Sequence, residues 1–424
     1  MAIPFFLLVL FLSFIYFEPS LFFPVLMEFR VAFVVSILTL VAVLLSGKKP
    51  VKAIQNWLFI LLLMMAILSS ILSPLPYSEN SQLQLSHLYK AIALFFLVSM
   101  IIESKEYLRR FYYITLVYGF VVSLTTLLTV RAGIPSLKGG DLYRMVNYFG
   151  GLGDDPNEFG AFMLALSPLP IVMLEGEKSF AKKILFSIMA ISFILCITRT
   201  RSRGAFIGLL FVFILMIWEN RKRFGMLVFF TFIIAYAYFN THHGYWERIA
   251  TLQSQEYIME DNSSRDRLLQ IQYATRLMGG YPLSGVGIGN YVQAKIQLLG
   301  LDPELKNTRH VAHNAFLGLG AEVGIFGLVI FIFILVTSIR NSYFSEKFLK
   351  NREDDFILYK MSKGIRLGLI GFSIGMFFLS EQYNPIFYQW IAFIVAIKNL
   401  PEKRNGRSPE PIKIFNSRKV SIRL

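Results

Sequence analysis

The sequence predicts an all-α polytopic integral membrane protein, and three observations support that fold class. The 424 residues are 55% hydrophobic and only 16% charged. Apolar runs of about 15 to 25 residues, close to the length that crosses a bilayer, recur along the chain. Short breaks rich in Lys, Arg, Pro or Gly separate these runs. The single cysteine, Cys196, excludes an intrachain disulfide and lies in an apolar run, so we expect it to be a packing residue.

The apolar runs predict about twelve spanning helices. The first run has no basic residue before it and no small-residue cleavage site after it, which favours a retained helix over a signal peptide. Several runs are shorter than about 20 residues, so neighbouring helices must shield them. The expected spans are residues 2–17, 29–46, 57–73, 88–102, 111–130, 158–174, 184–198, 204–218, 224–239, 312–339, 366–380 and 384–397.

Lys and Arg are unevenly divided between the two sides of this arrangement. One side holds 27 of the 42 basic residues, and the rule that cytoplasmic loops are rich in Lys and Arg makes that side and both termini cytoplasmic. The net charge of +15 then reflects topology and does not indicate nucleic-acid binding. The expected division is nine helices over 1–239, a large helical outer loop over 240–311, helices ten to twelve over 312–397, and a basic tail over 398–424.

An arginine hairpin breaks this pattern on the outer side. The stretch TRTRSRGAF places Arg199, Arg201 and Arg203 between two spanning runs. An extended turn would point all three guanidinium groups the same way, whereas a continued helix would place Arg199 and Arg203 on one face. Snorkelling to lipid headgroups is one explanation. An anion site is the other, because guanidinium is always charged and binds phosphate oxygens in pairs.

The outer loop contains a second basic cluster, in NSSRDRLLQIQYATRLMGGYPLSG. The pattern predicts a helix of about 14 residues with a cap at Ser263 or Ser264 and an end at Gly279–Gly280. Arg265 and Arg267 fall in its first turn, where cations are unfavourable unless an anion binds. The alternative is a solvated turn compensated by Asp266. The apolar stripe is expected at Leu268, Ile271, Ala274 and Met278.

His310, His313 and Asn314 stand in RHVAHNAFLGLGAEVGIFGL, where the outer loop enters the tenth helix. A histidine there is a candidate proton acceptor, because its pKa lies near working pH. A structural histidine at the loop-to-helix junction is the simpler alternative. A zinc pair is a third, but no further ligand stands at a telling spacing.

Two weaker motifs complete the outer side. GLGDDPNEFGAF enters the sixth helix, with acidic residues that include Asp155 and an Asn157 that can cap the helix. GVGIGN, residues 285–290, lacks both the strand and the spacing of a dinucleotide fingerprint, so we expect flexible backbone rather than a nucleotide site.

Four elements, in order, resemble the O-antigen ligase and polymerase superfamily of bacterial membrane glycosyltransferases. They are DDPNEFG, RSRGA, SRDRLLQIQYATRLMGGYPLSGVGIGNY and HNAFLGLGAEVGIFGL, over about residues 140–330. In that family a long periplasmic loop joins the ninth and tenth of twelve helices. The resemblance implies a bacterial inner-membrane enzyme whose site faces the periplasm and whose donor is a glycan on undecaprenyl pyrophosphate.

Residue roles follow from the resemblance position by position. The arginine of the SRGA element is Arg203, the loop arginine is Arg267, and the histidine of HN is His313. Arg201 or Arg265 would assist, and the substitution of Ile271 for a usual aromatic leaves the register between Arg265 and Arg267 open. Asn314, Asn157 and Asp155 are further candidate substrate-binding residues. No cofactor or metal is expected.

The resemblance predicts a metal-independent, inverting transfer in which the arginines bind the pyrophosphate and His313 acts as general base. The acceptor favoured is lipid A–core, as for a ligase; a polymerase would use another repeat unit, and a protein-directed enzyme a side-chain hydroxyl. No convincing pair of carboxylates supports a glycosidase. An anion transporter is disfavoured because the charges cluster at one face, and a non-catalytic lipid-binding scaffold remains a third class.

Overall fold

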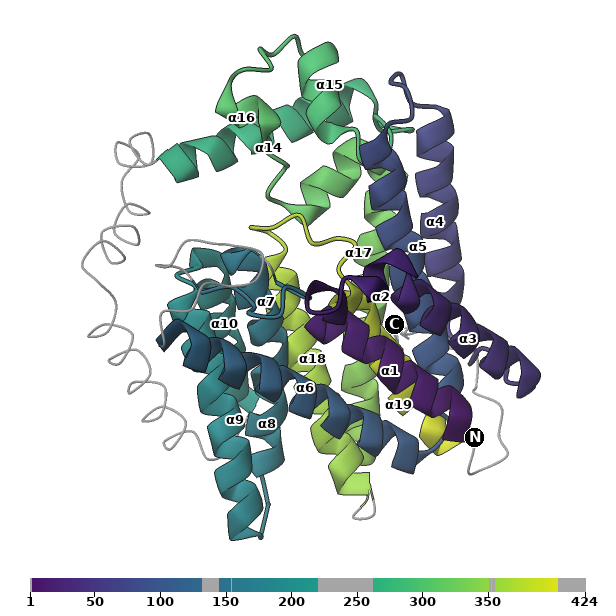
Figure 1. The fold of residues 1–424 in the computed structure, drawn as a ribbon, viewed down its shortest axis with the longest axis vertical. Helices are drawn as coiled ribbons and strands as arrows, with labels where there is room; N and C mark the ends of the chain where they lie inside the picture. The colour runs from purple at the N-terminus through teal and green to yellow at the C-terminus, as the bar shows by residue number, and fades with distance from the viewer. Residues whose placement is uncertain are drawn as a thin grey trace, which may run out of the picture.

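The computed structural model describes residues 2–131, 145–153, 155–219, 262–350, 352 and 355–402. Helices and their connections account for this part of the chain, and it contains no strand. A bundle of long helices forms the body, and α14 (Asn262–Gly280), α15 (Tyr291–Gln297) and α16 (Lys306–Arg309) lie together at one end of it, beside the upper ends of α4 and α5 (Figure 1). The predicted all-helical fold is therefore confirmed. Residues 262–311, which contain α14, α15 and α16, are called the outer segment below.

Six helical segments of the described chain are long and apolar enough to cross a membrane. Each expected span except 224–239, which lies outside the described residues, falls on a helix. The long segments are α4 (Ile54–Ile71), α5 (Glu79–Ile101), α6 (Lys105–Arg131), the joined α7 (Pro156–Leu166) and α8 (Pro168–Leu174), α9 (Phe180–Arg199) and α17 (Ala315–Leu349). Other elements are α1 (Ala2–Phe17), η1 (Pro19–Leu21), α2 (Val25–Glu28), α3 (Val31–Leu45), α10 (Arg203–Glu219), α18 (Phe356–Gly375) and α19 (Pro385–Glu402). As expected, Cys196 is buried, within α9.

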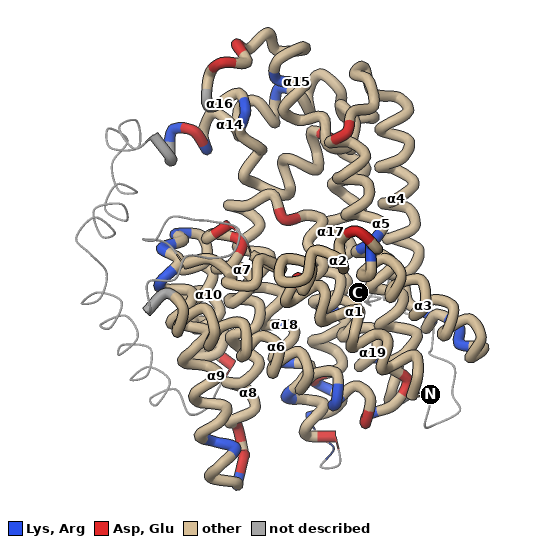
Figure 2. Tube along the Cα trace, viewed as in Figure 1, with Lys and Arg blue, Asp and Glu red and all other residues tan. Residues whose placement is uncertain are grey.

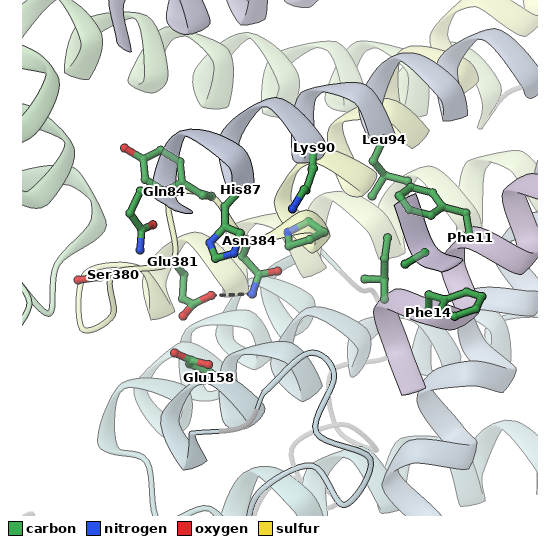
Figure 3. Close-up of a pocket in the computed structure, with 14 residues that line it drawn as sticks. Phe11, Phe14, Gln84, His87, Lys90, Leu94, Glu158, Ser380, Glu381 and Asn384 are labelled. Atoms are coloured by element: carbon green, nitrogen blue, oxygen red, sulfur yellow. Dashed lines mark hydrogen bonds between the residues drawn. The ribbon is translucent and has the colours of Figure 1, made fainter. Parts of the chain in front are cut away.

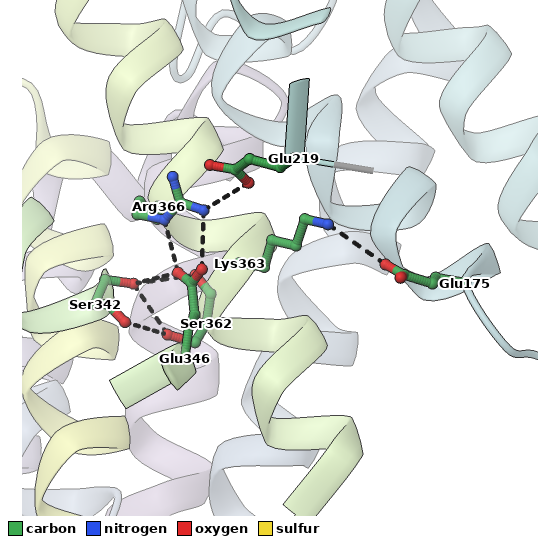
Figure 4. Close-up of polar contacts among 7 residues, drawn as sticks. All are labelled: Glu175, Glu219, Ser342, Glu346, Ser362, Lys363 and Arg366. Atoms are coloured by element: carbon green, nitrogen blue, oxygen red, sulfur yellow. Dashed lines mark hydrogen bonds and ion pairs between the residues drawn. The ribbon is translucent and has the colours of Figure 1, made fainter. Parts of the chain in front are cut away.

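The cytoplasmic loop expected over 340–366 is largely helical, because α17 continues to Leu349 and α18 begins at Phe356. Figure 4 shows why charged residues are accommodated there. Arg366 donates to the two carboxylate oxygens of Glu346 at 2.7 and 2.8 Å and to Glu219 at 2.9 Å. Charges that are paired can be buried between helices, although hydropathy treats them as a break in the span. The sequence prediction therefore placed the start of this span ten residues too late.

The backbone of α18 packs closely against α7. A Cβ atom on Gly368 would lie 2.2 Å from the Ala165 carbonyl oxygen, so the contact requires glycine. The helix is buried along nearly its whole length. This contact fixes the start of α7 relative to the loop that follows α18, and both segments border the site described below.

The outer segment is anchored at a break in α17. Gly324 has a φ of 80°, outside the helical region. Around this break, Val286 N–H donates to the Ala321 carbonyl at 2.9 Å and Ile325 N–H donates to the Pro282 carbonyl at 2.8 Å. The segment at 285–290, expected to be flexible backbone, is thus hydrogen-bonded to a spanning helix, and its glycines permit that close approach.

Candidate functional site

Two of the sequence motifs meet where the first turn of α7 packs against the turn between α9 and α10. A Cβ atom on Gly160 would lie 2.9 Å from both the Ala205 Cβ and the Thr200 Oγ1, so glycine is needed here. Met145 N–H also donates to the Arg199 carbonyl at 3.3 Å. Acidic and basic residues gather at these helix ends (Figure 2). The α7 motif and the arginine hairpin therefore form one structural unit.

The arginine hairpin adopts neither geometry expected from the sequence. Arg199 is the last residue of α9 and Arg203 the first residue of α10. Between them Arg201 has a φ of 54°, in the left-handed region that non-glycine residues seldom occupy. This tight turn leaves Arg199 exposed and the other two arginines half-buried. The hairpin thus separates Arg199 from Arg201 and Arg203.

The Phe378 ring connects the hairpin to the outer segment. A Cβ atom on Gly204 would lie 2.8 Å from the Phe378 Cβ, so this ring packs on the first turn of α10, next to Arg203. The Arg267 guanidinium lies over the same ring, 5.9 Å from its centroid. Phe378 therefore lies between the first turn of α10, which begins at Arg203, and the Arg267 guanidinium. Arg265 is exposed, whereas Arg267 is half-buried.

The α14 helix buries a mixed polar and apolar face that includes only Ala274 of the expected apolar stripe. It begins at Asn262, so Ser263 and Ser264 lie inside it, and it has 19 residues rather than about 14. Leu268 and Ile271, expected to be buried, are 45% and 41% exposed. The buried positions are Asp266, Gln270, Ala274 and Leu277. The predicted end at the Gly279–Gly280 pair is confirmed.

A fully buried lysine explains the two buried polar residues of α14. Lys295 donates to Gln270 Oε1 at 2.8 Å and to the His310 carbonyl at 2.7 Å. Gln270 in turn donates to Asp266 Oδ1 at 3.2 Å, and the other Asp266 oxygen contacts His310 Nδ1. Burial lowers the pKa of Lys295 to about 8, an effect that Asp266 opposes. This network holds α14 and the segment before α17 in one arrangement.

His313 lies directly beside this network. Its φ of 48° is again in the left-handed region, and the next residue, Asn314, caps α17 by accepting from the N–H groups of Phe316 and Leu317, each at 3.0 Å. The His313 and His310 ring centroids are 5.9 Å apart. Strained backbone that the surroundings hold in place is common at functional sites. The backbone before α17 therefore holds the His313 ring in place beside His310, while Asn314 caps the helix.

The electrostatic surroundings favour the neutral form of His313. Burial lowers the pKa of His313, the Arg267 charge lowers it further, and Asp266 and Asp155 act in the opposite direction. A neutral imidazole is the form that can accept a proton. These influences also show that His313 lies near an arginine from α14 and an aspartate from the start of α7.

Asp266, His310 and His313 have the composition of a metal site. One donor atom from each lies within 4.8 Å of the others. The sequence suggested no third ligand for the two histidines, since Asp266 precedes His310 by 44 residues. Imidazole nitrogen and carboxylate oxygen are ligands that Zn²⁺ accepts. The neighbouring Arg267 charge disfavours a cation there, so the geometry by itself assigns no ion.

The remaining candidate residues lie at the start of α7. Asp155 is the N-cap, and its Oδ1 accepts from Asn157 N–H at 2.7 Å. Asn157, expected to cap the helix, is instead the second residue of α7. The cap falls one residue before Pro156 because proline, which has no N–H, suits the first helical position. Asp155 is exposed and Asn157 is half-buried.

Part of the chain matches a known protein family. Residues 187–332 match a family model described as O-antigen ligase. This range includes the arginine hairpin, α14, the buried lysine network and His313. No curated protein matches the chain.

Proposed function

We propose that this chain transfers a glycan from undecaprenyl pyrophosphate to an acceptor hydroxyl. The premise is that the chain is a multi-pass membrane enzyme of the O-antigen ligase family. The favoured acceptor is lipid A–core. The observation that supports this most directly is that Phe378 joins the first turn of α10, which begins at Arg203, to Arg267, whose charge acts on His313. Cations beside a neutral histidine suit a reaction that releases an anion and a proton.

The arginines would bind the departing pyrophosphate. When the bond between the sugar and the phosphate breaks, its electron pair passes to the phosphate oxygen, where negative charge develops. Guanidinium groups of Arg203 and Arg267 can donate two parallel hydrogen bonds each to such oxygens. Arg201, half-buried in the same turn, is the expected assistant, while Arg265 is exposed. Fixed positive charge can in this way supply the stabilisation that a metal ion provides in other transferases.

His313 would act as the general base. As the acceptor oxygen bonds to the anomeric carbon, its proton passes to the imidazole, and the pyrophosphate leaves from the opposite side with inversion at that carbon. The lowered pKa of His313 keeps the ring neutral at neutral pH. Asp155 and Asn157, at the start of α7, remain candidates for binding sugar hydroxyls.

The proposal includes a topology. Twelve spans, with both termini in the cytoplasm of a bacterium, would place α14 and His313 on the periplasmic side of the inner membrane. The clustering of basic residues in alternate breaks supports this orientation. Within the same superfamily, a polysaccharide polymerase or a protein-directed oligosaccharyltransferase is the alternative, and the two differ from a ligase only in the acceptor.

The test is glycan transfer by the purified full-length protein in detergent with EDTA present. The donor is undecaprenyl-pyrophosphate oligosaccharide, and lipid A–core, a second donor molecule and a protein acceptor are offered in parallel. We expect transfer by the wild type and its loss in both His313→Ala and Arg203→Ala. Absence of transfer to every acceptor, in protein that moves an anion across liposomes, would instead support a transporter.

A further inference from the structure

Glu322 is a buried carboxylate that has no part in the chemistry proposed above. It lies in α17, after His313 and two residues before the break at Gly324, and its side chain is 6% exposed. None of its contacts within the described chain is with a Lys or Arg side chain. Burial of a carboxylate costs free energy unless hydrogen bonds replace those to water. The contacts of Glu322 should therefore reveal its function.

The glycine-rich loop before α15 supplies hydrogen bonds to Glu322. The backbone N–H groups of Gly289 and Tyr291 donate to its carboxylate. Gly287 N–H donates to its backbone carbonyl at 3.0 Å. The φ angles of Gly285, Gly287 and Gly289 are 66°, 94° and 74°, in the region that favours glycine. Consecutive turns of this kind aim backbone N–H groups at an anion. The loop therefore surrounds an anion that is a side chain of the protein itself.

Tyr291 connects Glu322 to α14, the helix that carries Arg267. The Tyr291 hydroxyl lies 2.9 Å from the Gln270 carbonyl oxygen and 3.1 Å from Gln270 Oε1. Gln270 follows Arg267 by about one turn of α14 and donates to Asp266, the residue before Arg267, at 3.2 Å. Because the backbone of Tyr291 binds Glu322 and its hydroxyl binds α14, this residue links the position of Arg267 to that of Glu322.

Tyr383 provides a second connection, through the loop between α18 and α19. Its hydroxyl donates to Glu322 Oε2 at 3.5 Å. The same loop contains Phe378, the ring under Arg267. Tyr383 and Ser380 also line a cavity of about 520 Å³ that α1, α5 and the first turn of α7 border (Figure 3). With open space on that side, packing alone does not fix the loop, so its hydrogen bond to Glu322 contributes to its position.

Both connections lead to Arg267. The first reaches the helix that carries it, and the second reaches the loop whose Phe378 ring lies under its guanidinium. Glu322 itself belongs to α17, and His313 lies just before the N-cap of that helix. A single buried carboxylate therefore contacts the supports of Arg267 from the helix that follows His313.

We infer that Glu322 is a positioning residue that sets the place of Arg267 relative to His313. It acts through Tyr291 and Tyr383 and touches neither the donor nor the acceptor. This inference rests on the proposed transferase activity and adds to it a residue outside the reacting groups. Loss of the carboxylate should therefore slow the chemical step while the acceptor still binds.

The test measures kcat and KM for the purified full-length protein in detergent, with the lipid-linked donor and the acceptor that the wild type uses. Glu322→Gln keeps the size of the side chain but leaves one acceptor oxygen for three donors. Displacing a catalytic group by about 1 Å can cost a hundredfold in rate, so kcat should fall by about 10- to 100-fold. The acceptor KM should stay within about twofold of wild type. Glu322→Asp, which keeps both oxygens, should recover part of the loss.

A double variant separates positioning from a general loss of stability. If Glu322 acts through Arg267, adding Glu322→Gln to Arg267→Ala should slow transfer by no more than about threefold further. Losses that multiply in the double variant would overturn the inference.

Glu346→Gln is the matched control. Glu346 lies in the same helix and is also 6% exposed, but it pairs with Arg366 near the other end of α17. This variant should lower Tm and leave kcat within about twofold of wild type. A loss of kcat as large as that of Glu322→Gln would mean that any buried acid of α17 has this effect, and would also overturn the inference.

Hydrogen–deuterium exchange provides a measurement that needs no substrate. In Glu322→Gln, the amides of residues 287–291 and 376–384 should exchange faster than in the wild type, because the hydrogen bonds to the carboxylate are weakened. Unchanged exchange in both segments would contradict the positioning role. Failure of the wild type to transfer glycan to any acceptor would instead refute the proposed function, whereas the exchange result tests the contacts of Glu322 by itself.

Discussion

Replacing Arg267 by alanine should slow glycan transfer about a hundredfold, and the structure explains why the neighbouring Arg265 should matter far less. Arg267 is half-buried over Phe378, whereas Arg265 is exposed. Loss of one donor to a developing anion costs ~3 kcal/mol, and roughly 1.4 kcal/mol corresponds to a factor of ten in rate. Without the guanidinium, the negative charge on the pyrophosphate loses part of its stabilisation.

Two further variants separate charge from geometry. Arg267→Lys keeps the charge but loses the planar fork that binds two oxygens, so we expect an intermediate loss of about tenfold. Phe378→Leu removes the ring under the guanidinium, 5.9 Å from it. A contact of that kind is worth about 0.5–1 kcal/mol, which predicts a two- to fivefold loss. The measurement is kcat/KM for the lipid-linked donor at a saturating acceptor concentration.

Arg265→Ala is the matched control, expected to stay within about threefold of wild type. An effect of Arg265→Ala equal to or larger than that of Arg267→Ala would refute the assignment, because an exposed side chain would then outweigh the one that the fold positions. Thermal unfolding of each variant in detergent distinguishes the two explanations for lost activity. A large fall in Tm for Arg267→Ala would indicate that its contact with Phe378 is structural.

Three other predictions concern the proposed base, the packing around Phe378 and the ion pairs of Glu346 and Glu106. His313→Ala should lower kcat by a factor of about 10² to 10⁴. Because burial and the Arg267 charge lower the pKa of His313, the acid limb of the pH profile of kcat/KM should lie below pH 6.5. Asp266→Asn removes a charge that raises this pKa and should move the acid limb to still lower pH. Gly204→Leu should lose most transfer activity, since even a Cβ atom would lie 2.8 Å from the Phe378 Cβ, whereas Gly279→Leu, where a Cβ meets open space, should retain it. Glu346→Ala leaves Arg366 buried without its main partner and should lower the free energy of unfolding by about 3 kcal/mol. Denaturation in detergent measures this change. Glu106→Ala, which breaks an exposed pair with Arg110, is the control and should lower the free energy of unfolding by about 0.5 kcal/mol or less.

The positions of most helices could be predicted from sequence, because a surface that meets lipid must be apolar over the length of a span. The expected segment 184–198 lies within α9, and 57–73 differs from α4 by only a few residues. The same argument failed for α18, where Lys360, Lys363 and Arg366 interrupt the hydropathy. These side chains contact acidic residues or backbone carbonyls of other helices, partners that hydropathy cannot reveal.

The candidate site could be predicted only in part. Arg203 and His313 stand in motifs with recognisable order, and the structure places Arg203 at the start of α10 and His313 just before the N-cap of α17. Asp266, Gln270 and Lys295 were not recognised as a network, because their contacts join positions up to 44 residues apart. Asp266 was considered only as a compensating charge between two arginines. A lone lysine in an amphipathic stretch gives no signal that it will be buried.

The most consequential error concerns the loop between α18 and α19. Sequence boundaries at 380 and 384 reduced it to a short turn, whereas α18 ends at Gly375 and α19 begins at Pro385. In the intervening residues the Met376 carbonyl accepts from Ala315 N–H at 2.9 Å, Phe378 lies between Gly204 and Arg267, and Ser380 lines the cavity. One loop thus contacts the start of α17, the first turn of α10 and the Arg267 guanidinium. Since Phe378 lies under Arg267 and the Met376 carbonyl accepts from the first residue of α17, a shift of this loop changes the surroundings of both Arg267 and His313. Substitutions at Phe378 should therefore change both the donor KM and the pH dependence of kcat/KM.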